Sequence, residues 1–219
     1  MSNIKRTLIT VLAMILVCVI SVSATLAYLY DKSESVVNTF SVGNVEISLD
    51  EADVDNDSNT ADNVTINGQI RDLANEYKLT SGATLPKDPT VHVSKYSEES
   101  YIFVEVVIGN DVAVVLDTAD ITAQMTTNGW TKLEGNIYYY NETVTGLGKA
   151  NNEDLPVFTT IKVKGTATGD ELVNAAADGQ NITLTAYAIQ ADTIKDDTKT
   201  HAANAKTAWD VLQDALPTT

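Results

Sequence analysis

Between residues 38 and 190, apolar and polar residues alternate with a period of two, which is typical of strands with one buried face. In the first of these stretches, "NTFSVGNVEISLD" (38–50), the apolar positions switch from even to odd numbers across Gly43. Such a switch turns half of the apolar set onto the wrong face unless one residue bulges out. We therefore expect a β-bulge or a sharp bend at Gly43. The apolar positions are Phe40, Val42, Val45, Ile47 and Leu49.

Five later segments also have the pattern of strands, and turn-rich loops separate them. The segment 101–109 is apolar on both faces except at Glu105, so we expect it to be a central strand. In the segment 90–96, His92 has the parity of the outward face. The pattern predicts an all-β fold, a jelly-roll-like antiparallel β-sandwich. The five segments are "TVHVSKY" (90–96), "YIFVEVVIG" (101–109), "NIYYYN" (136–141), "FTTIKVKGT" (158–166) and "NITLTAYAIQA" (181–191).

Helical spacing of apolar residues is found in two places. "GDELVNAAADG" (169–179) predicts a short crossing helix with Asp170 as its N-cap and Gly179 as its stop. Residues 201–216 place Trp209 and Leu212 on one apolar stripe, which predicts a C-terminal helix packed on the domain. The polar face of this second helix carries acids, so we expect it not to bind an anionic membrane.

An acidic stretch, "DEADVDNDSNTADN" (50–63), is expected to be a solvated loop, followed over residues 64–87 by a weakly structured excursion with one or two short elements. Three of its acids have the spacing of the first ligands in an EF-hand-type calcium loop. Ser58 stands where that loop needs glycine, and Val64 stands where it needs its last acid. A weak calcium site is the alternative to a solvated loop, and no other cofactor is expected. The candidate calcium ligands are Asp53, Asp55 and Asp57.

The N-terminus has the pattern of an export signal. Lys5 and Arg6 precede an apolar run over residues 8–20, and small residues follow it. We expect cleavage between Ala27 and Tyr28, which leaves residues 28–219 as a single secreted domain. The alternative is a retained membrane anchor, because weakly polar residues prolong the run to about the length that spans a bilayer.

The net charge limits the partners that we expect, and the cysteine content limits how the folded chain can be stabilised. The chain has a net charge of −16, and loss of Lys5 and Arg6 with the signal leaves −16 − 2 = −18. We therefore expect no binding to nucleic acid and no stable membrane insertion after cleavage. The single cysteine, Cys18, lies in the signal, so the mature chain has no disulfide and must be held together by its core.

No motif for catalysis is found in the sequence. The two histidines, His92 and His201, do not form the H-E-x-x-H pattern that zinc hydrolases use. The sequence also has no G-x-S-x-G nucleophile motif and no phosphate-binding glycine pattern, and we interpret residues 146–148 as a turn. We expect that the protein is not an enzyme.

Several of these segments together resemble one family. "TLAYLYD" (25–31) followed by "NTFSVGNVEISLDE" (38–51) is similar to the export signal and first strand of the TasA/camelysin (CalY) family of Gram-positive bacteria. The resemblance continues in the second half of the chain, whereas residues 52–88 match nothing in the family. The further matching segments are "GNIYYYN" (135–141), "DLPVFTTIKV" (154–163), "NITLTAYAIQAD" (181–192) and "AWDVL" (208–212).

The resemblance implies export through a SipW-type signal peptidase and self-association into extracellular fibres of a biofilm matrix. In such fibres the N-terminal strand of one subunit completes the sheet of its neighbour. Camelysin-like members are classed as metallopeptidases, an activity that no zinc motif supports in this chain. The open alternatives are that peptidase and a monomeric surface adhesin or binding module. The residues that we expect in the donated strand are Val36, Val37, Phe40 and Val42.

Overall fold

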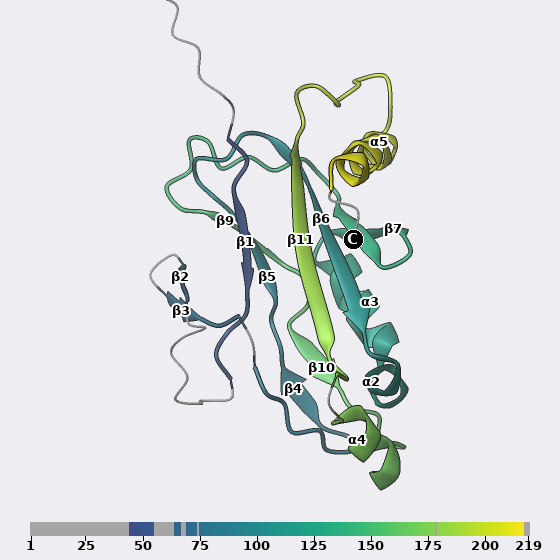
Figure 1. Cartoon of the computed structure of the whole chain (residues 1–219). Coiled ribbons are helices and arrows are strands. Elements are labelled where there is room, and N and C mark those ends of the chain that lie inside the picture. The colour runs from purple at the N-terminus through teal and green to yellow at the C-terminus, as the bar shows by residue number, and fades with distance from the viewer. Residues whose placement is uncertain (1–43, 55–63, 67–68, 74, 178, 217–219) are drawn as a thin grey trace, which may run out of the picture. The chain divides into compact units, whose positions relative to one another are not determined.

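The computed structural model describes residues 44–54, 64–66, 69–73, 75–177 and 179–216 (Figure 1). They belong to one unit of the chain, residues 42–219. Every strand pairing in it is antiparallel. The three-stranded sheet has the order β1 (Ile47–Asp50), β5 (Thr90–Val93), β9 (Glu153–Pro156). The four-stranded sheet has the order β11 (Ile182–Gln190), β6 (Ser100–Ile108), β8 (Ile137–Tyr140), β7 (Trp130–Glu134). The two-stranded pairs are β4 (Thr84–Pro86) with β10 (Thr160–Lys162), and β2 (Val64–Ile66) with β3 (Gln69–Arg71).

The main hydrophobic core is shared by the two larger sheets. Val91 and Val93 of β5 enter it from one sheet, and Ile102 and Val104 of β6 enter it from the other. All four side chains are almost completely buried. The alternation in the sequence thus identified the core-facing positions of β5, and β6 is the interior strand that its apolar character on both faces predicts.

A second core lies on the opposite face of the four-stranded sheet, under α5 (His201–Ala215). Trp209 of α5 contacts Phe103 at 5.2 Å between ring centroids and Tyr187 at 5.5 Å. Its indole N–H donates to Glu134 at 3.1 Å. The predicted C-terminal helix and its packing through Trp209 and Leu212 are confirmed.

Two helices that the periodicity did not reveal follow β6. They are α2 (Asn110–Val115) and α3 (Thr118–Thr127). The Asp117 side chain caps α3 by accepting from the Asp120 N–H. Ile121 and Met125 then bury one face of the helix in the main core.

The crossing helix α4 (Gly169–Ala175) exists, but its expected caps are wrong. Thr168, not Asp170, is the N-cap, and it forms a reciprocal capping box with Glu171. Glu171, three residues after Thr168, accepts a hydrogen bond from the backbone N–H of Thr168, and no such side chain lies three residues after Asp170. The helix also ends at Ala175, before Gly179 is reached.

The prediction of a mainly antiparallel β fold with few helices is confirmed in coarse form. The excursion over residues 64–87 contains three short strands, β2, β3 and β4, rather than the one or two elements expected. The expected solvated loop over residues 50–63 is wrong at its start, because Asp50 is the last residue of β1 and both Asp50 and Glu51 are buried. The bulge expected at Gly43 and residues 55–63 of the loop lie outside the described residues.

Candidate functional site: the free edge of β11

One edge of β11 is the most unusual backbone feature of the fold. Along its whole length β11 pairs with β6, and no strand among the described residues pairs with its other edge. The Gly109 N–H donates to the Asn181 carbonyl, and the Ala191 N–H donates to the Glu99 carbonyl, both at 2.8 Å. Odd-numbered residues of β11 therefore direct their backbone groups at β6. The residues whose N–H and C=O groups point to the free edge are Ile182, Leu184, Ala186, Ala188 and Gln190.

No residue of β11 guards its free edge, although β1 lies beside part of that edge. Edge strands are normally guarded by charges, proline or bulges. β7 has a bulge between Lys132 and Glu134, β9 ends with Pro156, and the Glu51 backbone after β1 bonds to that of Asp72. β11 has nine residues, and none of them is charged or proline.

The core is open beside this edge. Ala186 and Ala188 face the main core but are only half-buried. Their cross-strand partners on β6, Val104 and Ile102, are 0% and 1% exposed. The core-facing side chains of β6 are therefore fully covered, whereas those of β11 are partly exposed.

A groove begins where β11 begins. β1 and β11 lie side by side (Figure 1). A cavity of about 380 Å³ has Leu49 and Glu51, at the end of β1, and Ile182 and Leu184 of β11 in its lining. Leu73, which is strongly exposed, also lines it. Apolar side chains are thus accessible along the part of the free edge that faces β1.

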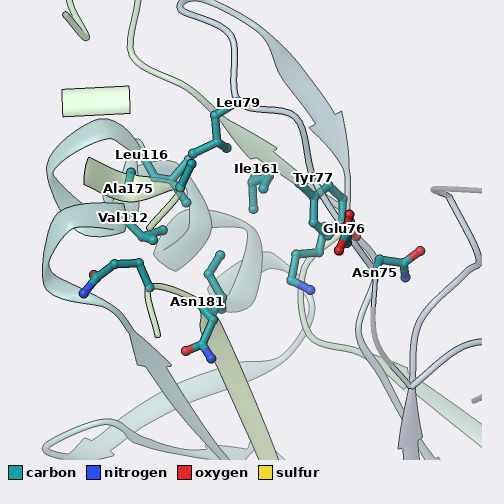
Figure 2. Close-up of a pocket in the computed structure, with 13 residues that line it drawn as sticks. Asn75, Glu76, Tyr77, Leu79, Val112, Leu116, Ile161, Ala175 and Asn181 are labelled. Carbon is teal, nitrogen blue, oxygen red and sulfur yellow. The ribbon is translucent and has the colours of Figure 1, made fainter. Parts of the chain in front are cut away.

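A second cavity of about 430 Å³ adjoins the first, and the two share Asn75, Lys87, Asn181 and Ile182 in their linings. One side of it is apolar and the other is largely polar. Figure 2 shows Val112, Leu116 and Ala175 on the apolar side, and Asn75, Glu76 and Tyr77 opposite them. We call the two cavities together the β11 groove.

The polar wall of the β11 groove contains a buried ion pair. Lys87 Nζ lies 2.7 Å from Glu51 Oε2, and the Tyr77 hydroxyl donates to the same oxygen at 3.3 Å. The ammonium also lies 5.1 Å from the centre of the Tyr77 ring. These contacts satisfy the charges within the wall, so the wall is preorganised and does not require a charged ligand.

A separate ionic cluster lies on the outer face of the three-stranded sheet. His92 Nε2 lies 2.9 Å from Asp50 Oδ1, and His92 Nδ1 lies 2.6 Å from Asp154 Oδ1. Asp50, His92 and Asp154 come from β1, β5 and β9, so the contacts join all three strands. His92 has the expected outward parity but is only 3% exposed, because side chains from other segments cover this face.

Arg71 of β3 is the main cation of this ionic cluster. Its Nε bonds to Asp50 Oδ1, and its Nη1 lies 3.2 Å from Asp88 Oδ2. Burial lowers the pKa of the guanidinium, but the hydrogen bonds and charges of Asp50 and Asp88 outweigh burial and raise it overall. Asp50 Oδ2 is buried and has no hydrogen-bond partner among the described residues.

The site residues expected from the sequence fall mostly outside the described residues. Asp53 is exposed, whereas Asp55 and Asp57 are not described. Among the described residues, no group of three or more histidine, cysteine or acidic side chains is placed to hold a metal ion. The undescribed positions are Ala27 and Tyr28 of the expected cleavage site and Val36, Val37, Phe40 and Val42 of the expected donated strand.

His201, the other histidine, has a structural environment. Its Nε2 lies 2.9 Å from the Tyr140 carbonyl oxygen, and its ring packs on Tyr101 and Tyr139 at 5.4 and 5.8 Å. These contacts anchor the start of α5 on the four-stranded sheet.

Sequence reasoning did not single out the free edge of β11. The segment "ITLTAYAIQ" has no charge and no proline, but this lack indicates an unguarded edge only once the strand order is known. Nothing in the sequence indicated that Arg71 reaches Asp50, because their partnership depends on how the excursion packs.

Comparison of the chain with family models, curated proteins and solved structures gives no significant match. The resemblance to the TasA/camelysin family therefore stays a hypothesis. Within the part of the chain that is described, no helix has both the length and the apolar character needed to span a bilayer.

Proposed function

We propose that this protein is a secreted structural subunit, built on a jelly-roll-like sandwich, that polymerises into extracellular matrix or cell-surface fibres. Export would use a SipW-type signal peptidase that cuts between Ala27 and Tyr28. The segment 28–43 of one copy would then pair with the free edge of β11 in the next copy. The observation that supports this proposal is the long, uncharged and unguarded edge of β11 beside an open core.

The proposal follows from the physics of strand addition. An added strand satisfies the edge-facing backbone groups of β11 and covers the half-buried side chains beneath them. Donor and acceptor surfaces differ, so each subunit can donate to one neighbour and accept from another. Such a head-to-tail contact does not close and therefore gives filaments.

A second candidate function is a monomeric binding module. The cavity of Figure 2 supports it, because about 430 Å³ with apolar and polar sides is within the range of small-molecule sites. A protein that stays monomeric at all concentrations and binds a small ligand would favour this candidate.

The test of the proposed function is a proline on the free edge. In Ala186→Pro the lost N–H points away from β6, so the β6–β11 pairing is preserved while strand addition is blocked. The matched control is Ala186→Gly, which weakens the strand but keeps the N–H. Negative-stain micrographs of mature protein beginning at Tyr28 are expected to show filaments for the native chain and for Ala186→Gly only.

The melting temperature of each monomer checks that the variants are folded. If folded Ala186→Pro forms filaments as long and abundant as the native chain does, the edge of β11 is not the acceptor and the proposal is wrong.

A further inference from the structure

The cavity of about 430 Å³ in the β11 groove has a wall that is part of the main hydrophobic core (Figure 2). The side chains of this wall are at most 5% exposed, so close packing in the core fixes its shape. A ligand that lies against the wall needs an apolar surface of its own. The residues of the wall are Val112, Leu116, Ile161 and Ala175.

Gln180, in the polar part of the lining, provides N–H donors in a fixed orientation. Its Oε1 accepts from the Asp111 N–H at 3.1 Å. Because a backbone N–H needs an acceptor, this hydrogen bond determines which end of the amide is oxygen. The two N–H groups on Gln180 Nε2 have no hydrogen-bond partner among the described residues. They are therefore suited to an oxygen atom of a ligand.

Lys87 adds donors to the same cavity, but its charge is already balanced. An ammonium has three N–H groups. Among the described residues, Lys87 Nζ hydrogen-bonds only to Glu51 Oε2, at 2.7 Å. Glu51 thus neutralises Lys87, and Glu76 also lines the cavity. An anionic ligand would gain little from Lys87 and would be repelled by the two acids, whereas a cationic ligand would meet the ammonium.

We propose that this cavity binds a small neutral molecule that carries an oxygen acceptor, such as a carbonyl group, next to an apolar group. The N–H groups of Gln180 and Lys87 are the donors for the oxygen, and the apolar group lies against Val112 and Leu116. Binding here does not depend on strand addition. The proposal therefore goes beyond the proposed function and applies to a fibre subunit as well as to a monomer.

Three probes that share a six-carbon chain test the polarity and charge of the ligand. They are N-hexylacetamide, which is neutral and has a carbonyl acceptor, hexanoate, which is an anion, and hexylammonium, which is a cation. A good ligand of about ten non-hydrogen atoms has a Kd of about 1 mM. Saturation-transfer NMR on the mature protein beginning at Tyr28 should give N-hexylacetamide a Kd at least about tenfold lower than the other two probes have.

Gln180→Glu tests the donors with the least disturbance of the fold. It keeps the oxygen that accepts from the Asp111 N–H and replaces only the N–H groups by a carboxylate oxygen. The Kd of N-hexylacetamide should rise about tenfold. The matched control is Gln213→Glu, which adds the same charge at an exposed position of α5 and should leave the Kd unchanged.

Two adjacent alanines test the location of the site. Ala176 lines the cavity and Ala177 does not, and both are exposed. Ala176→Trp should abolish binding of N-hexylacetamide, whereas Ala177→Trp should leave it unchanged. The melting temperature of each variant checks that it is folded.

The proposal is overturned if N-hexylacetamide does not bind, if the three probes bind equally, or if folded Ala176→Trp binds as the native chain does. An unchanged Kd in folded Gln180→Glu would overturn the role of its donors. Filaments are scored on the same samples by negative stain. Filaments without probe binding would contradict this site alone, and probe binding without filaments would contradict the proposed function alone.

Discussion

Among single residues, Arg71 has the clearest energetic role. It is paired with Asp50, whose side chain is only 1% exposed and also contacts His92. Replacing Arg71 by methionine leaves a buried carboxylate without its main counter-charge. We expect Arg71→Met to lower the free energy of unfolding by about 3 kcal/mol, as measured by urea denaturation.

The matched control for Arg71→Met is Lys206→Met, which removes a cation from the exposed pair with Asp210. Exposed pairs contribute little, so we expect no measurable loss of stability there. Equal losses in the two variants would show that the ionic cluster on the three-stranded sheet has no special role.

Gly146 is a second position at which a substitution should destabilise the fold, because a single added Cβ atom would clash there. A Cβ at this position would lie 1.8 Å from the backbone oxygen of Ser94. We expect Gly146→Ala to cost at least about 2 kcal/mol, because the obstacle is backbone and the chain must shift. Thermal unfolding measures the loss.

Gly148, two residues later, provides the control for Gly146→Ala. It has a φ of +79° and open space around its Cβ position. Asparagine adopts such a φ more easily than most residues, so Gly148→Asn should be tolerated. If both variants melt like the native protein, the close approach of Gly146 to Ser94 does not exist in solution.

For single residues, the sequence predicted which face of a strand a side chain lies on better than it predicted what surrounds that side chain. Parity placed Val91 and Val93 in the core and His92 on the other face, and all three assignments hold. Burial of His92 was not predictable, because it depends on Arg71 and on acids from other segments. The turn interpreted at Gly146 likewise gave no sign of its contact with Ser94.

Among the elements, α3 is tied to β10 through two side chains. Asp120 Oδ1 accepts from Lys162 Nζ at 2.5 Å, and Asp120 Oδ2 accepts from Gln124 at 2.7 Å. Gln124 in turn donates to the Thr160 carbonyl at 3.0 Å. The hydrogen bond from Lys162 is the largest cause that lowers the pKa of Asp120.

The lowered pKa gives a pH-dependent prediction for Asp120→Asn. Because the folded pKa lies below the unfolded one, the stabilisation is present above the unfolded pKa and is lost as the pH falls through the folded pKa. We therefore expect Asp120→Asn to be less stable than the native chain at pH 7. Urea denaturation at about pH 2.5 should give nearly equal stabilities, and a difference that persists in acid would contradict the assigned role.

Strands were more predictable than helices in this chain. Residues 158–166 alternated clearly, and Ile161 and Val163 are buried while Lys162 and Lys164 are exposed, as expected, although the strand β10 covers only Thr160–Lys162. In contrast, α2 is one short apolar segment that has no amphipathic period of its own. α4 was found, but its N-cap was misplaced because two residues near its start have capping side chains.

For the whole molecule, the net charge would oppose the proposed assembly. The mature chain would carry −18, and neighbours in a filament would repel one another. We expect polymerisation to accelerate as the pH falls toward the isoelectric point near 4.3. Light scattering of mature protein between about pH 4 and 8 measures this, and a flat response would contradict the role of charge.

The organisation of the whole molecule was predicted only in part. Composition and alternation indicated a disulfide-free, mainly antiparallel β domain, and the described residues have that organisation. The open core beside β11 could not be predicted, because it depends on which strand lies at the edge of the sheet. Strand order is set by long-range pairing, which periodicity does not encode.

The central claim is that donor and acceptor lie on different copies of the chain, and a mixing experiment tests it most directly. One mature variant lacks residues 28–42 and can only accept, and the other carries Ala186→Pro and can only donate. Each alone should remain monomeric, and a mixture should give a one-to-one heterodimer by size-exclusion chromatography with light scattering. A mixture that stays monomeric, or filaments formed by the deletion variant alone, would contradict the account.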